Sequence, residues 1–388
     1  MTDWKRHFAQ FAGIIDEKFD DLVLSLRKRL DTFKPLQIVP YRSYGTARRV
    51  YIKGRVLEDK KIASAADKDT ILNNLVNMYK RFESDEVAGA KLKANFGSEV
   101  HEVTTDAEGY FVLDIHPVEP IIAESLWHKI PLELLHAPIP HDKGITSHAE
   151  VMIPPPDAEY GIISDIDDTI VRTGATDLLA MSRTTFLNNA KTRLPFAGVA
   201  EFYRSLQLGR NGKRNNPFFY VSSSPWNLYD LLKDFLDLNN IPEGPLLLRD
   251  FGINRESVTG GSHMSHKFKE ISQIMEAYPH LGFVLVGDSG QEDPVIYQEV
   301  VKQFPDRVLA VYIRDVQLPD REKIAVDISK SLLEQKVEMI IVDNTVEAAE
   351  HAAKTGLIYT EAIPAIVQEK KEDKGEKPGK EEATITSE

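Results

Sequence analysis

Apolar residues recur every three or four positions along residues 3–34, which is the spacing of one face of an amphipathic helix. The apolar positions are Trp4, Phe8, Phe11, Ile15, Phe19, Leu22, Leu26 and Leu30. The residues between them mix acidic and basic side chains, whereas binding to anionic lipid favours a cleaner basic face. We therefore expect an N-terminal helix within residues 1–35 that packs on the rest of the protein or in a dimer. Attachment to a membrane surface is the alternative.

Alternating apolar and polar residues then predict a mainly β, sandwich-like domain over residues 36–153. The expected strands are 49–56, 91–96, 100–104, 110–115, 126–133 and 147–153. Residues 105–109 end in glycine and predict a hairpin turn between the third and fourth of these strands. One helix is expected at about residues 66–83.

The pattern changes after Pro154, Pro155 and Pro156, a run that resists both helix and central strand and marks a domain boundary. Over residues 154–367, short apolar segments alternate with helical ones, which predicts an α/β domain with a doubly wound parallel sheet. The expected strands are 161–164, 217–221, 245–248, 282–286, 308–314 and 337–342. The expected helices are 197–207, 227–238, 267–277, 293–303, 322–335 and 345–355. Residues 368–388 are rich in Lys and Glu without apolar periodicity, so we expect a disordered tail.

Composition narrows the class of protein. The formal net charge is -13, and because nucleic acid is bound by basic surfaces, no nucleic-acid partner is expected. The chain has no cysteine, which excludes disulfides, Cys-based zinc sites and a thiol nucleophile. The first residues lack the apolar core of a signal peptide, and no apolar run approaches the ~20 residues that span a bilayer. We expect a cytoplasmic protein without a transmembrane segment.

Two of the predicted strands run into clustered carboxylates. Asp165 and Asp167 follow the strand at 161–164, while Asp288 follows the strand at 282–286 and precedes Asp293. Like charges at close range repel, so a bound divalent cation is the simplest explanation for such a cluster. Asp288 can ligate Mg²⁺ directly and Asp293 either directly or through water, because Mg²⁺ keeps several waters.

Hydroxyl and cationic residues follow other strands. Ser222 and Ser223 come after the strand at 217–221, where a hydroxyl can donate to a phosphoryl oxygen, and Lys267 opens a helix as a fixed cation. Arg249 and Arg314 lie near strand ends, where either a second anionic group of a substrate or a salt bridge can hold them. All these residues fall at the carboxyl ends of parallel strands, which is where open α/β sheets bind ligands. Phosphoryl transfer needs such a nucleophile, metal, cation and set of donors together.

These motifs resemble those of the haloacid dehalogenase superfamily. Asp165-Ile166-Asp167-Asp168-Thr169 is similar to its phosphatase-type first motif, and Ser222, Lys267 and the pair Asp288 and Asp293 resemble the other three. Residues 164–169, 246–252 and 287–291 more closely resemble the actin-patch-type phosphatidate phosphatases and their bacterial relatives. The resemblance covers about residues 155–365 and implies a haloacid dehalogenase-like fold, and the preceding β region is similar to one that many bacterial relatives carry.

The resemblance also implies a role for each residue. Asp165 is expected to attack phosphorus, and Asp167 to protonate the leaving oxygen and then activate water, in a catalytic set completed by Thr169, Ser222 and Lys267. Ser223, Arg249 and Arg314 are expected to bind substrate. The Mg²⁺ ligands are expected to be Asp165, the backbone carbonyl of Asp167, Asp288 and Asp293.

The segments available for a lid, about 170–194 and 249–265, are short, so a minimal cap and an open site are expected. An open site suits a substrate that brings its own cover, such as a phospholipid monoester at a membrane surface. The leading hypothesis is a Mg²⁺-dependent, phosphatidate phosphatase-like hydrolase that forms an aspartyl-phosphate and is cytoplasmic or peripheral at the membrane. The alternatives are a phosphatase for protein or nucleic-acid ends, and a scaffolding protein built on the β domain with secondary phosphatase activity.

Overall fold

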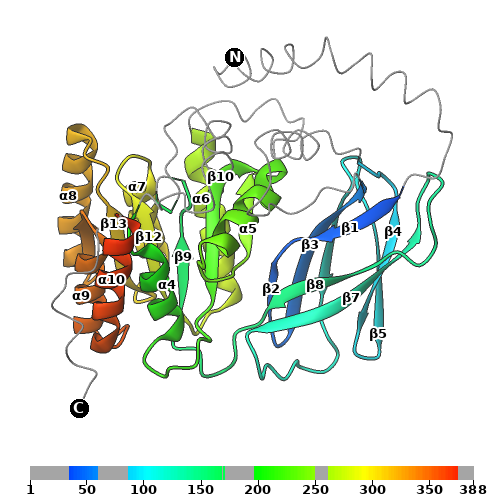
Figure 1. Cartoon of the computed structure of the whole chain (residues 1–388), viewed down its shortest axis with the longest axis horizontal. Helices are drawn as coiled ribbons and strands as arrows, with labels where there is room; N and C mark the ends of the chain where they lie inside the picture. Colours follow the sequence, from blue (N-terminus) through cyan, green and yellow to red (C-terminus); the bar gives the residue numbers. More distant parts are fainter. Residues whose placement is uncertain (1–34, 60–85, 168, 171–195, 250–260, 375–388) are drawn as a thin grey trace, which may run out of the picture.

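The computed structural model describes residues 35–59, 86–167, 169–170, 196–249 and 261–374. Within these ranges it contains a mainly β region and an α/β region with a parallel sheet (Figure 1). The predicted helices at 1–35 and 66–83 and most of both predicted cap segments lie outside the described residues.

In its described residues, the β region contains eight strands joined by hydrogen bonds into a single sheet. These are β1 (Leu36–Pro40), β2 (Ser43–Thr46), β3 (Arg49–Glu58), β4 (Lys91–Phe96), β5 (Glu99–Thr104), β6 (Tyr110–Ile115), β7 (Trp127–His136) and β8 (Thr146–Met152). The order is β1-β3-β2-β8-β7-β4-β5, with β6 on the free side of β3. Alternate side chains from almost all of these strands meet in one core, including Ile52, Leu92, Phe111, Leu132 and Val151. The mainly β character is therefore as predicted, with one curved sheet in place of two separate ones.

The predicted hairpin at residues 105–109 is wrong. The turn is present, but β5 pairs with β4 and β6 pairs with β3. Gly109 has φ +76° and its N–H bonds to Asp106, while its own carbonyl accepts from Val56 of β3. These bonds lead the chain across to a different neighbour, so a turn signal in the sequence did not identify the partner strands.

The second sheet has six parallel strands in the order β11-β10-β9-β12-β13-β14. They are β9 (Tyr160–Ser164), β10 (Phe218–Pro225), β11 (Leu246–Arg249), β12 (Gly282–Asp288), β13 (Val308–Arg314) and β14 (Met339–Val342). The helices are α4 (Val199–Leu208), α5 (Tyr229–Leu238), α6 (Gly261–Ala277), α7 (Asp293–Gln303), α8 (Pro319–Glu334), α9 (Thr345–Lys354) and α10 (Ile363–Asp373), with short 3-10 turns at Trp226–Leu228 and Thr360–Ala362. The predicted doubly wound parallel sheet is confirmed.

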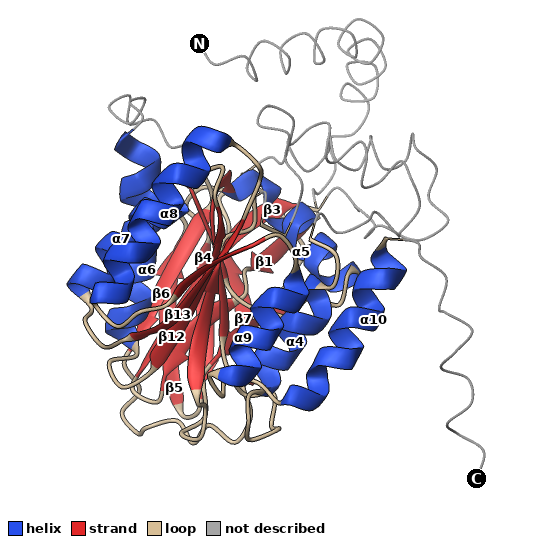
Figure 2. Cartoon of the chain, turned by 90° about the vertical axis from the view of Figure 1, so that its left-hand side faces the viewer, coloured by secondary structure: helices blue, strands red, loops and turns tan. Residues whose placement is uncertain are grey.

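Helices cover both faces of this sheet (Figure 2). Successive strand residues point to opposite faces, so Ile162 belongs to the core that includes residues of α4, α5, α9 and α10, whereas Ile163 belongs to the core that includes residues of α6, α7 and α8. Burial on both faces explains why the strands are almost continuously apolar in sequence. Among the described helices, none is both long and apolar enough to cross a membrane.

Helix α10 corrects the predicted start of the polar tail at residue 368. The helix continues to Asp373 because Ile366 is buried in the core and two of its carboxylates bind the start of α4. Asp373 accepts from the backbone N–H of Gly198 at 2.7 Å, and Glu369 accepts from that of Glu201 at 2.6 Å. Acidic residues that looked like a solvated tail therefore cap another helix. Residues 375–388 lie outside the described ranges.

Candidate active site

The acidic motifs meet at the point where the order of the parallel sheet reverses. Strands β9 and β12 are neighbours, although they are first and fourth along the chain, and Asp165 directly follows β9 while Asp288 ends β12. The backbone N–H of Asp165 extends the pairing by donating to Val286 at 2.9 Å. A reversal of strand order opens a crevice at the carboxyl ends of the strands, and ligands of doubly wound sheets bind there.

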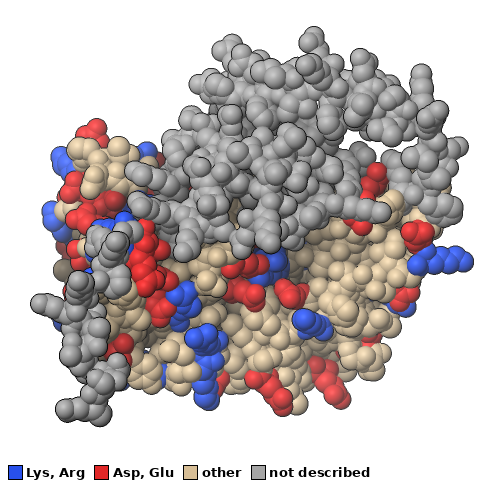
Figure 3. Space-filling view, in the orientation of Figure 1, with Lys and Arg blue, Asp and Glu red and all other residues tan. Residues whose placement is uncertain are grey.

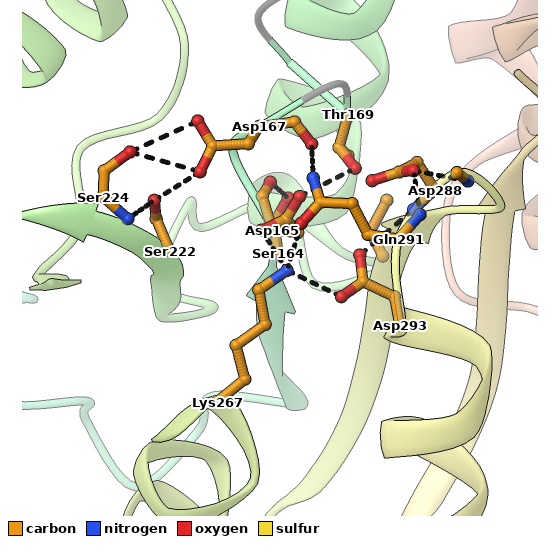
Figure 4. A network of polar contacts seen from close by, with 12 residues as sticks. Ser164, Asp165, Asp167, Thr169, Ser222, Ser224, Lys267, Asp288, Gln291 and Asp293 are labelled. Carbon is orange, nitrogen blue, oxygen red and sulfur yellow. Dashed lines mark hydrogen bonds and ion pairs between the residues drawn. The ribbon is translucent and has the colours of Figure 1, made fainter. Parts of the chain in front are cut away.

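Asp165 lies at the centre of the polar network (Figure 4). Its side chain is 1% exposed, its Oδ1 lies 2.7 Å from the Lys267 ammonium, and its Oδ2 accepts from the Thr169 hydroxyl at 3.3 Å. Burial raises the pKa of the Asp165 carboxyl well above its usual value, the Lys267 ammonium opposes that rise, and neighbouring carboxylates add to it. The site thus needs positive charge to keep Asp165 ionised.

Lys267 supplies part of that charge from α6. Its ammonium lies 2.7 Å from carboxylate oxygens of both Asp165 and Asp293, and its side chain is almost fully buried. Burial lowers the pKa of Lys267, but the two carboxylates outweigh that effect and hold the pKa well above its usual value. The lysine therefore remains a cation.

Asp288 and Asp293 complete an acidic group. Oxygens of Asp165, Asp288 and Asp293 lie within 4.8 Å of one another, and all three residues are buried. Backbone N–H groups of Gly290 and Gln291 donate to Asp288, at 2.7 and 3.0 Å, and fix its carboxylate. Three converging carboxylates beside a single lysine leave an excess of negative charge, and oxygen ligands of this type suit Mg²⁺. The donor set therefore fits a divalent cation.

The Asp167 side chain lies apart from that group. Its Oδ2 accepts from the Ser222 hydroxyl at 2.7 Å and from the Ser224 hydroxyl at 3.2 Å. Its backbone carbonyl accepts from the side-chain amide of Gln291 at 2.9 Å. Asp167 is thus bound on one side by the end of β10 and on the other by the loop after β12.

Ser224 and Gln291 were not predicted as site residues. The strand β10 continues through Pro225, so Ser222 and Ser224 share a face, and this period of two in the sequence was the available signal for Ser224. The same alternation places Ser223 on the opposite side, away from Asp167. Gln291 carries no comparable signal, because its contacts with Asp167 and, at 3.4 Å, Lys267 depend on how two loops meet.

The two predicted arginines lie at strand ends on either side of this centre. Arg249 ends β11, opposite Pro225 in register, and is 8% exposed. Arg314 ends β13, opposite Asp288 in register, and its guanidinium lies 5.5 Å from the centroid of the Phe196 ring. Substrate binding by Ser223, Arg249 and Arg314 stays a prediction.

The part of the chain that carries this site is similar to known proteins. Residues 160–315 match the model of the family described as the catalytic domain of phosphatidate phosphatase APP1. The chain is 36% identical over 180 residues to Phosphatidate phosphatase APP1 of Saccharomyces cerevisiae, covering 45% of this chain and 30% of the yeast protein. It is 30% identical over 247 residues to an uncharacterized Schizosaccharomyces pombe protein, covering 62% of this chain and 38% of that protein. The chain thus spans well under half the length of both relatives.

Solved structures add little. A carbohydrate acetylesterase from Xanthomonas citri aligns at 9% identity with a TM-score of 0.25, covering 80% of this chain and 68% of its own. A likeness this weak carries no argument about fold. The family match instead covers the five strands β9 to β13 and every motif described above, from Asp165 to Asp293. Over its parallel-sheet domain, the chain is similar to the APP1-type phosphatidate phosphatases.

Proposed function

We propose that this protein hydrolyses a phosphomonoester of the phosphatidate type, with Mg²⁺ as cofactor and through an aspartyl-phosphate on Asp165. The observation that carries the proposal is the convergence of Asp165, Lys267, Asp288 and Asp293 in one buried cluster at the reversal of strand order. The match to the catalytic domain of a phosphatidate phosphatase supports the substrate class.

Asp165 is the proposed nucleophile. One of its oxygens forms a bond to phosphorus while the bond from phosphorus to the leaving oxygen breaks. Lys267, 2.7 Å from Asp165 Oδ1, keeps the carboxylate ionised and offsets negative charge on the phosphoryl group during the transfer. The Thr169 hydroxyl, 3.3 Å from Oδ2, orients the same carboxylate.

Asp167 is the proposed acid and base. In the first step its protonated carboxyl gives a proton to the leaving oxygen, and in the second step the carboxylate takes a proton from the water that attacks the aspartyl-phosphate. Ser222 and Ser224 donate to this carboxyl at 2.7 and 3.2 Å. When the carboxyl is protonated it can donate to Ser222 instead, and the Ser222 hydroxyl can then donate to a phosphoryl oxygen. Asp165 and Asp167 thus have separate partners, as two carboxylates with separate tasks require.

Asp165, Asp288 and Asp293, with the backbone carbonyl of Asp167, are the residues that would hold Mg²⁺. When bound, the ion supplies positive charge that neutralises the carboxylates and the transferring phosphoryl group. The bonds of Asp293 to the Lys267 ammonium at 2.7 Å and to the backbone N–H of Asp288 at 3.2 Å hold its carboxylate beside the other two, which supports this role.

We also infer that the parallel-sheet domain has a haloacid dehalogenase-like fold. Numbered along the chain, the parallel strands have the order 3-2-1-4-5-6, with the proposed nucleophile after the first strand. The division into a β domain at 36–153 and a phosphatase domain from 154 follows the boundary between the two sheets, although the second domain extends at least to Asp373.

The test is Mg²⁺-dependent phosphate release by the full chain from phosphatidate vesicles, p-nitrophenyl phosphate, a nucleotide, a sugar phosphate and a phosphopeptide. We expect phosphatidate to exceed the soluble esters by more than roughly tenfold in kcat/KM, because contacts remote from phosphorus add binding in the transition state. Asp165→Asn keeps the shape of the side chain without its charge, so it should lower turnover of every substrate by at least ~10³-fold at an unchanged melting temperature.

Three outcomes would contradict parts of the proposal separately. More than about a tenth of the activity remaining in Asp165→Asn refutes the aspartyl-phosphate. Full activity in excess EDTA, or equal activity with Ca²⁺, which prefers more ligands at longer distances, refutes the Mg²⁺ role. Equal turnover of lipid and soluble esters refutes the lipid substrate.

A further inference from the structure

The β region contacts the α/β region beside the proposed acid and base. Between β1 and β2, the Tyr41 ring lies 4.8 Å from the Trp226 ring, centroid to centroid, with 19° between their planes, and 4.3 Å from the Tyr229 ring. The Lys53 ammonium of β3 lies 4.0 Å from the Trp226 centroid. Trp226 is therefore held by both a stacked ring and a cation from the β region, and such contacts fix an indole in position.

A second set of contacts ties the same corner to α5. The backbone N–H of Arg42 donates to the Tyr229 hydroxyl at 2.6 Å. The Arg42 guanidinium, 3% exposed, lies 2.9 Å from carboxylates of both Asp237 and Glu243. Helix α5 and the loop after it are thus attached to the β region by polar contacts of a buried arginine.

Trp226 is covalently close to the residues that hold Asp167. It follows Pro225, the last residue of β10, and Ser224 comes directly before that proline. The Ser224 hydroxyl donates to Asp167, and the Ser224 backbone N–H donates to the Ser222 hydroxyl, which also donates to Asp167. Proline at 225 limits backbone rotation, so the position of Trp226 is transmitted to both hydroxyls.

We propose that the β region positions Asp167 for proton transfer, through Trp226 and the Ser222–Pro225 end of β10. Trp226, Tyr41, Lys53 and Ser224 are positioning residues in this scheme, because they act through the Asp167 carboxyl. This inference rests on the proposed function and gives the β region a task within it. Asp165, Lys267, Asp288 and Asp293 belong to other elements, so the nucleophile and the acidic group do not depend on this contact.

Displacement of Asp167 and damage to Asp165 can be distinguished by comparing substrates with different leaving groups. Phosphoryl transfer to Asp165 expels the leaving oxygen, which takes the proton of Asp167 as its bond to phosphorus breaks. An aliphatic alkoxide is a strong base and needs that proton, whereas p-nitrophenolate leaves readily without it. A displaced Asp167 should therefore slow an alkyl phosphate far more than an aryl phosphate, while damage to Asp165 or to the fold slows both alike.

The experiment compares kcat/KM for n-butyl phosphate and p-nitrophenyl phosphate, because kcat/KM reports the step that expels the leaving group. In Trp226→Ala we expect a loss of at least about tenfold with butyl phosphate and less than about threefold with p-nitrophenyl phosphate, since general acid catalysis contributes about 10²- to 10⁴-fold. Trp226→Phe retains a ring that can stack on Tyr41 and should recover both values to within about threefold.

A matched control lies on the opposite face of the parallel sheet. Tyr44 of β2 also packs against the α/β region, with its ring 5.7 Å from that of Phe219 and 6.5 Å from that of Tyr278. Tyr44→Ala removes a contact of similar size between the two regions, so it should change both substrates by the same factor. We call the ratio of the kcat/KM loss with butyl phosphate to the loss with p-nitrophenyl phosphate the skew of a variant. Asp167→Asn should give the largest skew, against which the other variants are compared.

The outcomes separate this inference from the proposed function. Equal effects of Trp226→Ala on both substrates overturn the positioning role, as does the same skew in Tyr44→Ala. If Trp226→Ala unfolds, Lys53→Met is the second variant, because it removes the cation and leaves the Trp226 ring in place. It should slow butyl phosphate more than p-nitrophenyl phosphate, by a smaller ratio than Trp226→Ala. Equal effects of Lys53→Met on the two substrates overturn the inference. Loss of both activities in Asp165→Asn, with a skew in Asp167→Asn but none in Trp226→Ala or Lys53→Met, overturns this inference and leaves the proposed function standing, whereas no turnover by the parent chain refutes both.

Discussion

Gly287, directly before Asp288 in β12, is the position where one added methyl group most directly tests the site. A Cβ built there lies 2.5 Å from Oδ2 and 2.8 Å from Cβ of Asp293. The Asp293 carboxylate cannot move away without weakening existing contacts, because its Oδ1 lies 2.7 Å from the Lys267 ammonium and its Oδ2 accepts from the Asp288 N–H. Gly287→Ala must therefore displace Asp293.

The expected change in the free energy of unfolding of Gly287→Ala combines two destabilising effects and one stabilising effect. Overpacking a buried site costs about 1–3 kcal/mol. A weakened hydrogen bond to a charged group costs about 1.5–3 kcal/mol. Replacing glycine by alanine returns about 0.4–1 kcal/mol through the unfolded chain. We expect a net loss of roughly 2–4 kcal/mol, which lowers the melting temperature by about 4–16 °C for a domain of this size.

The assay measures melting temperature with and without Mg²⁺, and the Mg²⁺ dependence of p-nitrophenyl phosphate turnover. If Asp293 is the ligand we propose, its displacement should weaken Mg²⁺ binding by at least about tenfold, so the parent chain should gain more thermal stability from Mg²⁺ than the variant does. Gly97→Ala is the control, since its Cβ meets nothing within 4 Å and only its φ of +59° opposes the change. A Gly287→Ala variant with the melting temperature and Mg²⁺ dependence of the parent would refute the packing argument and the metal role of Asp293.

Two further predictions concern stability. Arg42→Met should destabilise the contact between the two regions by about 1–3 kcal/mol. The loss should be smaller than for a fully buried ion pair, because Asp237 and Glu243 are 32% and 54% exposed and can rehydrate. A urea unfolding midpoint equal to that of the parent chain would contradict this prediction. Glu369→Ala should remove a cap from α4 and cost about 0.5–2 kcal/mol. Glu372→Ala, which loses only an exposed contact to Gln368, should cost less than about 0.5 kcal/mol, and equal losses in the two variants would refute the cap.

The parallel sheet and the acidic cluster were predictable because both follow from local sequence. Strands buried on two faces must be continuously apolar, so β9 and β12 stand out, and the carboxylates after them interrupt that pattern. Parallel strands then bring their carboxyl ends to one edge whatever the details of packing. Asp165 and Asp288 meet for that reason, without any knowledge of the loops between them.

The contacts that were missed depend on partners distant in the sequence. The turn at 105–109 has ordinary hairpin chemistry, yet hydrogen bonds to β3 and β4 decide its neighbours. Glu369 and Asp373 have the composition of a solvated tail until the N-terminus of α4, which has no side-chain cap of its own, lies beside them. Local propensity cannot identify such partners, because the free energy comes from satisfying backbone groups elsewhere in the chain.

The net charge of the chain also does not predict where its charged residues lie. The net charge of -13 does not make every surface acidic: on the face seen in Figure 3, lysines and arginines are interspersed with acidic residues in the described part. In the buried centre, three carboxylates converge beside Lys267. An acidic protein can thus accept a phosphate ester only if its active site carries its own cations. Lys267 is one such cation, and a divalent ion held by Asp165, Asp288 and Asp293 would be the second, so the acidic cluster, which by itself repels a phosphate, would become the means of binding it.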